Sequence, residues 1–261
     1  MVEPGPGLED GLSQSDSDVR FEWGPFGAAH LAAGAACLVV VDVLSFTTAV
    51  AIVVARGTTV FPYPWDDAGA EDFASGHDAE LAVRRREVSD THPWSLSPAV
   101  LSRAPVTPRL VLPSPNGSTI ASGLGSGLGS GPPVVAACLR NASSVGRWLL
   151  AHGYGTSGRP AVVVASGERW PDGSLRPALE DALGAGAVLG HLKAAGCSLS
   201  AEAESMATLY DAIGDVERAI RSCGSARRLT AAGYGGDVDV AAVVDCDGVV
   251  PVVKDGAFSA S

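Results

Sequence analysis

One local pattern recurs along this chain: a short apolar run ends on polar residues, and these open a helix-like segment. The clearest copy is Val39 to Thr48, where three valines lead to Asp42 and a Ser-Phe-Thr-Thr segment follows. Runs of β-branched residues are typical of buried strands, and polar residues before a new periodic segment are typical of helix N-termini. Strands that alternate with helices predict an α/β fold. We expect a three-layer α/β/α sandwich with a mostly parallel, mixed central sheet.

The composition agrees with a sheet that is covered on both faces. Hydrophobic residues make up 46% of the 261 residues and charged residues only 18%, which suits buried parallel strands. The net charge of −11 disfavours nucleic acid and anionic membranes as partners. An anionic substrate would therefore need a local cation, such as a bound metal ion.

The chain is expected to form one domain. Residues 1 to 18 are acidic and rich in Gly, Pro and Ser, which predicts a disordered tail without a signal peptide. Residues 19 to 261 continue the strand–helix pattern, although Gly123 to Gly131 reads as a flexible loop. The apolar run before Asp42 is too short to span a bilayer. The five cysteines form no C-x-x-C pair, so we expect free thiols and a cytoplasmic location.

Two further segments carry local predictions. Val238 to Val244 and Val249 to Val253 read as closing strands that form a hairpin, which would make the sheet mixed. Arg84 to Arg86 follows a predicted strand at Glu80 to Arg84 and is expected to be a solvated basic turn. A homodimer is one arrangement that the chain allows, because apolar helices such as Leu179 to Leu192 can face either the sheet or a second subunit.

Four predicted strand ends carry polar residues before the next helix. Because open α/β sheets bind ligands at the carboxyl ends of their strands, we expect these residues to share a pocket. Any one of them is more often an ordinary helix cap or an acid favoured by the helix dipole, so the joint pattern carries the prediction. The residues are Asp42, Ser45, Thr47 and Thr48; Asn116, Gly117 and Ser118; Asn141; and Glu168 and Arg169, followed by Glu180 and Asp181.

The chemistry of these residues suits an oxyanion and a hard cation. Helix N-termini present unpaired N–H groups and a partial positive charge, so several that converge can hold a phosphate. Asp42, Glu180 and Asp181 supply the oxygen ligands that Mg²⁺ prefers, and Glu168 could act as general base or as a further ligand. The predicted substrate-binding residues are Ser45, Thr47, Thr48, Asn116, Gly117, Ser118, Asn141 and Arg169.

Several common site types are disfavoured. The five histidines show no H-x-x-H or H-E-x-x-H spacing, and no G-x-S-x-G sequence exists, which disfavours zinc hydrolases and α/β-hydrolases. Gly153 to Gly158 matches G-x-G-x-x-G, but a predicted helix precedes it and a strand follows, the reverse of a dinucleotide site. Asp245 and Asp247 resemble the D-x-D motif of haloacid-dehalogenase-like phosphatases, yet only 14 residues follow Asp247, so a polar turn is favoured.

The polar strand ends resemble those of the 2-phosphosulfolactate phosphatase family. The resemblance covers roughly residues 37 to 253, and the motifs keep the order and spacing of the family. They are VVVDVLSFTTAV, LPSPNGSTIA, CLRNASSV, ASGERW followed by LEDALGAGAVL, and a weaker SARRLTAAGYGGDVD.

This resemblance implies a magnesium-dependent phosphoric monoester hydrolase with a three-layer α/β/α fold. The named member of the family removes phosphate from 2-phospho-3-sulfolactate, a step towards coenzyme M. Asp42 matches the strand-end aspartate of the family, and Asn116 with Gly117 matches its Asn-Gly pair. The remaining matches fall on polar family positions: Asn141, Glu168, Glu180 and Asp181.

Two positions depart from the family pattern. Ser45 and Thr119 stand where arginines usually follow Asp-Val-Leu and Asn-Gly-Thr, so two cations for phosphate or sulfonate are missing. Arg140, Arg169, Arg227 or Arg228 are candidates to replace them. We expect a magnesium-dependent phosphatase for a small anionic phosphoester. The competing hypotheses are a non-catalytic small-anion-binding protein on the same fold, which the missing arginines favour, and a nucleotide-binding transferase.

Overall fold

The computed structural model describes residues 12–64, 69–125 and 131–261. Residues 1–11 of the predicted tail lie outside this range, as do residues 126–130 of the predicted glycine-rich loop. Within residues 12–18, the Gln14 side chain exchanges hydrogen bonds of 2.8 and 3.0 Å with the backbone of Phe21. The first described residues are therefore attached to the strand that follows them.

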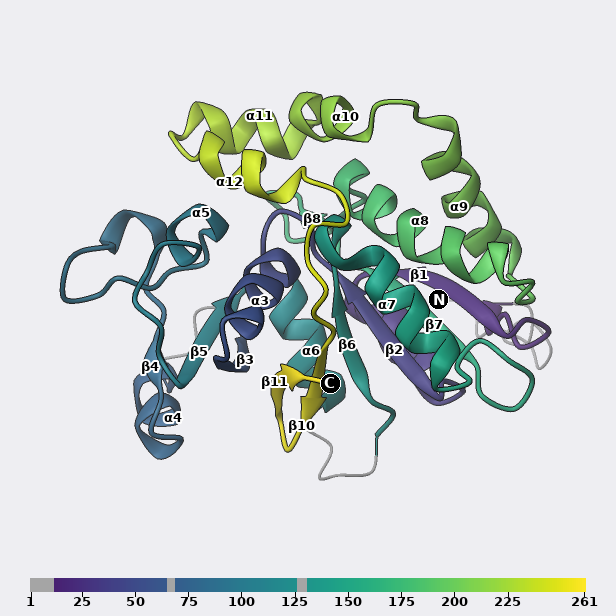
Figure 1. The fold of residues 1–261 in the computed structure, drawn as a ribbon, viewed down its shortest axis with the longest axis horizontal. Coiled ribbons are helices and arrows are strands. Elements are labelled where there is room, and N and C mark those ends of the chain that lie inside the picture. Colours follow the sequence, from purple (N-terminus) through teal and green to yellow (C-terminus); the bar gives the residue numbers. More distant parts are fainter. Residues whose placement is uncertain (1–11, 65–68, 126–130) are drawn as a thin grey trace.

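Nine strands of the described chain form one sheet in the order β1-β7-β2-β6-β10-β11-β3-β5-β4 (Figure 1). The pairings β1/β7, β7/β2, β2/β6, β3/β5 and β5/β4 are parallel, which confirms the mostly parallel sheet. The strands are β1 (Val19–Trp23), β2 (Cys37–Val41), β3 (Thr59–Pro64), β4 (Glu80–Leu81), β5 (Arg109–Ser114), β6 (Val134–Ala137), β7 (Ala161–Ala165), β10 (Pro251–Lys254) and β11 (Ala257–Ala260).

Side-chain alternation along the central strands builds two cores. In β2, Leu38 and Val40 join one hydrophobic cluster, whereas Val39 and Val41 join the other, as expected for a strand that is buried on both faces. The first cluster includes side chains of α2 (Gly24–Ala32), α3 (Phe46–Ala55) and α6 (Gly117–Gly125). The second includes α7 (Ala142–Ala151), α8 (Leu179–Ala194) and α9 (Ala201–Ala212). The three-layer α/β/α sandwich is confirmed.

The sheet is mixed, but the predicted hairpin is wrong. Val238 to Val244 begins within α12 (Gly235–Ala241), and the hairpin consists instead of β10 and β11. Val238, Ala241 and Ala242 are buried, a helical i, i+3, i+4 spacing that overrides the strand preference of valine. The hairpin, yellow in Figure 1, lies between β6 and β3 and pairs antiparallel with both.

The sheet brings distant strands together at their carboxyl ends. Four strands separate β2 from β5 in the sheet order, so the two would lie roughly 24 Å apart in a flat sheet. Nevertheless, the Gly117 amide that follows β5 lies 2.9 Å from the Asp42 carboxylate that follows β2. The hairpin β10/β11 pairs with β6 and β3 only near their starts, at Val135 and Val60, so the two halves of the sheet can approach each other at the carboxyl ends.

Two segment boundaries follow from the local sequence. The helix α2 begins at Gly24, and Pro25 occupies its first turn, where the missing proline N–H costs no helical hydrogen bond. The strand predicted for Glu80 to Arg84 stops at Leu81 and gives way to the 3₁₀ turn η1. No helix of the described residues is long and apolar enough to cross a membrane. The other helices are α4 (Ala70–Gly76), η1 (Arg85–Glu87), α5 (Pro98–Leu101), η2 (Leu139–Asn141), α10 (Val216–Ser222) and α11 (Gly224–Ala231).

Candidate active site at the strand ends

A cavity of about 240 Å³ lies where the ends of β2 and β5 meet the loop after β7. Four predicted site residues line it, and two arginines from other parts of the chain join them. The four are Asp42, Ser45, Asn116 and Glu168, and the arginines are Arg85 and Arg228. Carboxylates and guanidinium groups therefore share one small cavity.

The Asp42 carboxylate is buried and held by two helix N-termini. Its Oδ1 accepts a hydrogen bond from the Phe46 amide of α3 (3.2 Å), and its Oδ2 accepts one from the Gly117 amide of α6 (2.9 Å). Burial raises the pKa of Asp42 to about 6, and the nearby Glu168 carboxylate adds to the rise, although the two amides oppose it. In this structure, two amides at the helix N-termini that we expected to receive phosphate donate to the Asp42 carboxylate.

Close packing explains why a glycine follows Asn116. A Cβ atom at Gly117 would lie 2.6 Å from Cδ1 of Phe46 and 2.8 Å from Oδ2 of Asp42. Any side chain here would push α6 away from the carboxylate. The glycine therefore allows the contact between the β5 end and the β2 end that forms the cavity.

Glu168 reaches the cavity from a small hairpin that follows β7. The hairpin pairs β8 (Glu168–Arg169) with β9 (Leu175–Arg176). The Glu168 carboxylate forms an ion pair of 2.7 Å with Arg228 of α11. This ion pair joins the hairpin after β7 to α11, and both residues line the cavity.

The two acids at the start of α8 lie outside the cavity lining. Asp181 accepts hydrogen bonds from the amides of Val43 and Gly167, each 2.8 Å. Burial, with the charges of Asp42 and Glu180, raises the pKa of Asp181 well above its usual value. Glu180 is also buried and hydrogen-bonds the Cys223 thiol, whose pKa is raised to about 12 mainly by burial. Asp181 therefore connects the loops after β2 and β7.

Three of the predicted substrate-binding hydroxyl groups form hydrogen bonds with the protein backbone. The Thr47 hydroxyl bonds the backbone of Asp42, and the Thr48 hydroxyl donates to the Val43 carbonyl (2.9 Å). The Ser118 hydroxyl joins the β5 end to the Tyr63 carbonyl of β3. These buried groups fix the turns around the cavity.

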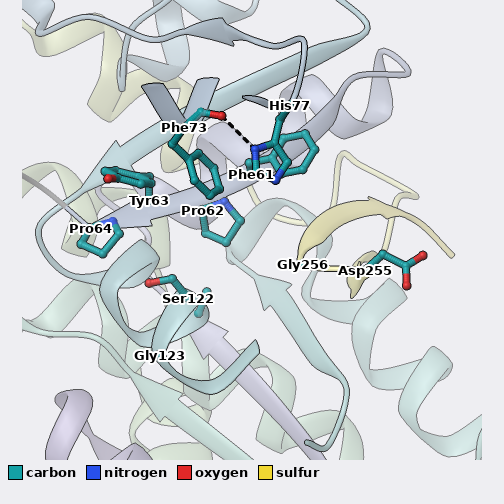
Figure 2. A pocket seen from close by; sticks show the side chains of 11 residues that line it. Phe61, Pro62, Tyr63, Pro64, Phe73, His77, Ser122, Gly123, Asp255 and Gly256 are labelled. Atoms are coloured by element: carbon teal, nitrogen blue, oxygen red, sulfur yellow. Dashed lines mark hydrogen bonds between the residues drawn. The ribbon is translucent and has the colours of Figure 1, made fainter. Parts of the chain in front are cut away.

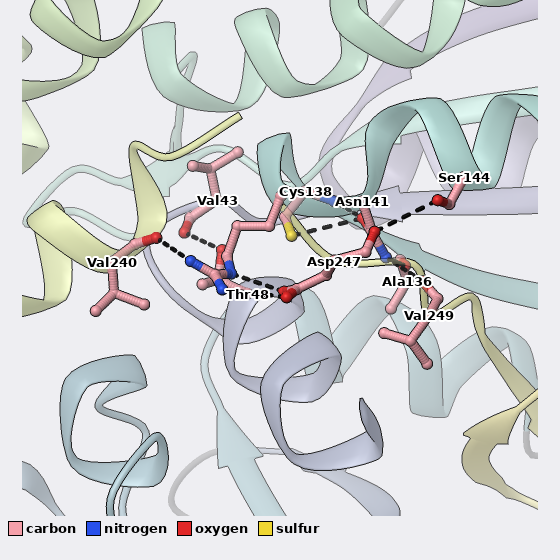
Figure 3. Close-up of polar contacts among 10 residues, drawn as sticks. Val43, Thr48, Ala136, Cys138, Asn141, Ser144, Val240, Asp247 and Val249 are labelled. Carbon is pink, nitrogen blue, oxygen red and sulfur yellow. Dashed lines mark hydrogen bonds and ion pairs between the residues drawn. The ribbon is translucent and has the colours of Figure 1, made fainter. Parts of the chain in front are cut away.

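Asn141 also links backbone segments. Its Oδ1 accepts from the Cys138 amide (2.9 Å), and its Nδ2 donates to the carbonyls of Ala136 and Val249 (Figure 3). Beside it, Arg140 pairs with Asp247 at 2.7 Å. This strand end therefore holds the C-terminal segment in place, and Arg140 is engaged there.

Arg85 corrects the prediction of a solvated basic turn. Its Nη2 donates to the Ser45 hydroxyl and to the Leu96 carbonyl (3.1 Å), and its Nε lies 2.8 Å from the Asp237 carboxylate. The neighbouring Arg86 side chain is 71% exposed, as expected for such a turn. Local sequence gave no signal for Arg85, although Asp237 lies in the GYGGDVD part of the family motif.

A second cavity of about 460 Å³ adjoins the first, and the two share Glu168 and Arg228. Arg169, Arg176 and the Trp170 ring also line it. The Arg169 guanidinium approaches the Pro115 carbonyl at 3.4 Å, so this exposed arginine lies near the β5 end. A ligand in the first cavity can therefore extend into a cationic surface on an otherwise acidic protein.

A third cavity of about 470 Å³ differs in character (Figure 2). Its wall is aromatic: the Phe73 ring lies 4.8 Å from that of Tyr63 and 4.2 Å from that of His77. Asp255 is the one carboxylate among its described lining residues, and no arginine or lysine is among them. This cavity lacks the paired acids and cations that anion chemistry requires.

The strand-end cavity provides oxygen donors for a hard cation. No three His, Cys, Asp or Glu side chains of residues 12–64, 69–125 and 131–261 form a complete metal site. However, Mg²⁺ is often held by one or two carboxylates together with water and substrate oxygens, and Asp42 and Glu168 both face the cavity. The Ser166 hydroxyl is buried without a hydrogen-bond partner among the described residues. Its amide donates to the Val41 carbonyl (2.8 Å), so Ser166 lies next to the strand end that carries Asp42. The oxygen donors at this end, Asp42, Glu168 and Ser166, are of the type that Mg²⁺ prefers.

The fold is that of an α/β protein, and its strand ends surround a cavity that contains both carboxylates and guanidinium groups. The sequence model of the 2-phosphosulpholactate phosphatase family matches residues 28–256, and the chain therefore belongs to this family. This match confirms the resemblance seen in the motifs, and the family name indicates a phosphatase, that is, a phosphoric monoester hydrolase. No curated protein matches the chain significantly.

Proposed function

We propose that this protein is a Mg²⁺-dependent phosphatase that hydrolyses a small anionic phosphoester similar to 2-phosphosulfolactate. The observation that carries the proposal is the convergence of Asp42 and Glu168 with Arg85 and Arg228 in one cavity. Acids that hold a cation and arginines that hold an oxyanion are the two requirements of phosphoryl transfer.

In this proposal, Asp42 is the direct protein ligand of Mg²⁺. Its carboxylate lines the cavity, and the amides of Phe46 and Gly117 fix its orientation. When bound, the ion would neutralise phosphate charge and activate water for attack. Asp181 and Glu180, which the sequence suggested as ligands, lie behind the cavity wall. They are proposed to support the loops that position Asp42.

Glu168 is proposed to act as general base towards the attacking water, or as a further ligand of the ion. It lines the cavity, and its ion pair with Arg228 restricts its position. A base must lie within hydrogen-bond reach of the proton that it removes. The shared cavity supports this role.

The adjoining cavity is proposed to hold the organic part of the ester. Arg169, Arg176 and Arg228 surround it, and guanidinium groups bind carboxylate and sulfonate oxygens well. Its volume of about 460 Å³ is sufficient for a small organic acid. The arginines also concentrate an anion near a protein whose net charge is −11.

The experiment is a phosphate-release assay over a panel of small phosphoesters that includes 2-phosphosulfolactate, with Mg²⁺ and with EDTA. The proposal expects release from at least one anionic ester, and it expects EDTA to abolish this release. Binding without release would support the non-catalytic anion-binding alternative. Transfer of a group from ATP would support the transferase. Release that persists in EDTA would contradict the role of the metal.

A further inference from the structure

Arg85 enters the cavity from a chain segment that the family motifs do not include. It lies in η1, and its side chain is 19% exposed. Its guanidinium donates to the hydroxyl of Ser45, which occupies the N-cap position of α3 but makes no capping hydrogen bond. A permanent positive charge thus lies at the wall of the cavity on the Ser45 side.

Several contacts fix this guanidinium. Nε pairs with Asp237 at 2.8 Å, and Nη2 donates to the Leu96 carbonyl and to the Ser45 hydroxyl. The Tyr234 ring lies 5.5 Å from the guanidinium carbon. Nη1 makes no hydrogen bond to the described residues. Because the Arg85 side chain lines the cavity, its unpaired N–H donors are candidates to bind a ligand there.

Asp237 is itself tightly held. Its side chain is 1% exposed, and its Oδ1 accepts hydrogen bonds from the Ser97 hydroxyl and from the Ala99 amide (3.1 Å). The carboxylate therefore connects α12 and the start of α5 to the arginine. Asp237 does not line the cavity. It can therefore influence a ligand there only through Arg85.

Stability alone is a poor reason for this pair. Removing an arginine and an aspartate from water costs free energy that the ion pair seldom recovers. An exposed arginine, such as the adjacent Arg86, avoids that cost. A guanidinium held in one orientation at a cavity wall is instead suited to bidentate recognition of an oxyanion.

We propose that Arg85 binds the phosphoryl oxygens of the substrate and that Asp237 is a positioning residue for its guanidinium. The inference rests on the proposed function and adds the cation that the sequence lacks at position 45. In this arrangement the phosphate lies between Arg85 and the metal side of the cavity near Asp42. Arg85 supplies hydrogen bonds that strengthen as negative charge develops on the phosphoryl oxygens.

The first experiment compares Arg85→Ala with Arg86→Ala, which removes the same charge one residue away. The full chain is titrated with inorganic phosphate in the presence of Mg²⁺, and kcat/KM is measured for the best ester of the panel. Arg85→Ala is expected to weaken phosphate binding and to lower kcat/KM by about 10- to 100-fold, the scale of a charge-assisted hydrogen bond. Arg86→Ala is expected to change both by less than about twofold.

The second experiment tests positioning. Asp237→Asn is expected to lower kcat/KM, and the double variant Arg85→Ala/Asp237→Asn is expected to be no worse than Arg85→Ala alone, because Asp237 acts only through Arg85. Added guanidinium ion is expected to restore part of the activity of Arg85→Ala but none of that of Arg86→Ala. A pair with a purely structural role would also be coupled, but guanidinium ion would not restore the activity of Arg85→Ala.

The outcomes separate this inference from the function that it rests on. If the wild-type protein neither binds phosphate nor releases it from any ester, the proposed function fails. If the wild-type protein is active and Arg85→Ala matches Arg86→Ala, the role of Arg85 alone is overturned. Should Arg85→Ala fail to fold, Arg85→Lys keeps the charge but loses the planar fork, and it is still expected to bind phosphate more weakly.

Discussion

Two aspartates of this protein are nearly identical in burial and bonding, yet of the two only Asp42 lines one of the three cavities described above. Asp42 is 5% exposed and Asp181 is 3% exposed, and each accepts hydrogen bonds from two backbone amides. Asp42 follows β2 and lines the strand-end cavity, whereas Asp181 lies in the first turn of α8 and connects two loops. Burial and pKa shifts alone would not separate them.

The comparison shows that an acid at a strand end becomes a candidate for chemistry only where space remains beside it. Burial raises the pKa of both carboxyls, as it does at many functional sites. Asp181 uses its two oxygens to order the loops after β2 and β7. Asp42 keeps contact with a cavity that also contains Glu168, Arg85 and Arg228. The predictions that follow test this division of roles.

The largest effect is expected from Asp42→Asn. Loss of the anionic ligand should lower kcat/KM for phosphate release by at least about 100-fold, the scale of removing one electrostatic contributor to a transition state. Steady-state kinetics on the panel ester checks this, and circular dichroism confirms the fold. Turnover within tenfold of the wild type would contradict the role of Asp42.

The activity should also depend on the ionisation of Asp42. Its pKa of about 6 predicts that turnover at limiting Mg²⁺ falls about tenfold for each pH unit below that value, because Mg²⁺ binds the ionised form. At saturating Mg²⁺, this acidic fall in turnover should occur at lower pH, because the metal competes with the proton for Asp42. A pH profile at two Mg²⁺ concentrations measures the shift, and an unchanged limb would show that another group controls activity.

In the absence of metal, the raised pKa of Asp42 makes the folded protein less stable as the pH rises, whereas activity is expected to increase with pH. Because the folded state binds the Asp42 proton more tightly than the unfolded state, this contribution is complete below the ordinary value of 3.8 and is lost as the pH rises through about 6. Denaturation in EDTA across this window should therefore show the Asp42-linked part of the unfolding free energy decreasing with pH, and Asp42→Asn should remove that part.

Asp181→Asn should lower the free energy of unfolding and should affect activity much less. An asparagine amide cannot accept from both Val43 and Gly167, so one buried N–H loses its partner, at a cost of about 1–3 kcal/mol. Urea denaturation measures the loss. Activity per folded molecule should remain far above that of Asp42→Asn. The reverse order of the two activities would make Asp181, and not Asp42, the metal ligand.

The smallest expected effect belongs to Ser166→Ala. A buried hydroxyl without a partner costs free energy, so its removal in EDTA should raise the unfolding free energy by about 1 kcal/mol. In Mg²⁺ the gain should disappear if the hydroxyl contacts the ion or its water. Denaturation curves in both buffers test this. A variant that is less stable in both would mean that the hydroxyl has a structural partner.

The sequence identified the strand ends because their signal is local. An apolar run that ends on Asp42, and an Asn-Gly pair at Asn116 and Gly117, can each be read within a short window. The open-sheet rule then places them together. The local sequence could not show which polar side chains would form hydrogen bonds with the backbone instead of a ligand. Thr47 and Asn141 are two such side chains.

Long-range contacts explain the rest. Arg85 and Asp237 are 152 residues apart in the sequence. No local pattern around either residue indicates that the two form an ion pair. The helix α12 was mistaken for a strand because its valines favour strands when tertiary packing is unknown. The strand β11, Ala257–Ala260, has no strong alternation, so the true hairpin could not be recognised.

The most direct test is a crystal structure of the full chain soaked with Mg²⁺ and phosphate. The account predicts an Asp42 carboxylate oxygen at about 2.0–2.1 Å from the ion, with the phosphate between the ion and Arg85. It is contradicted if the ion or the phosphate binds elsewhere and the Asp42 carboxylate contacts only the amides of Phe46 and Gly117.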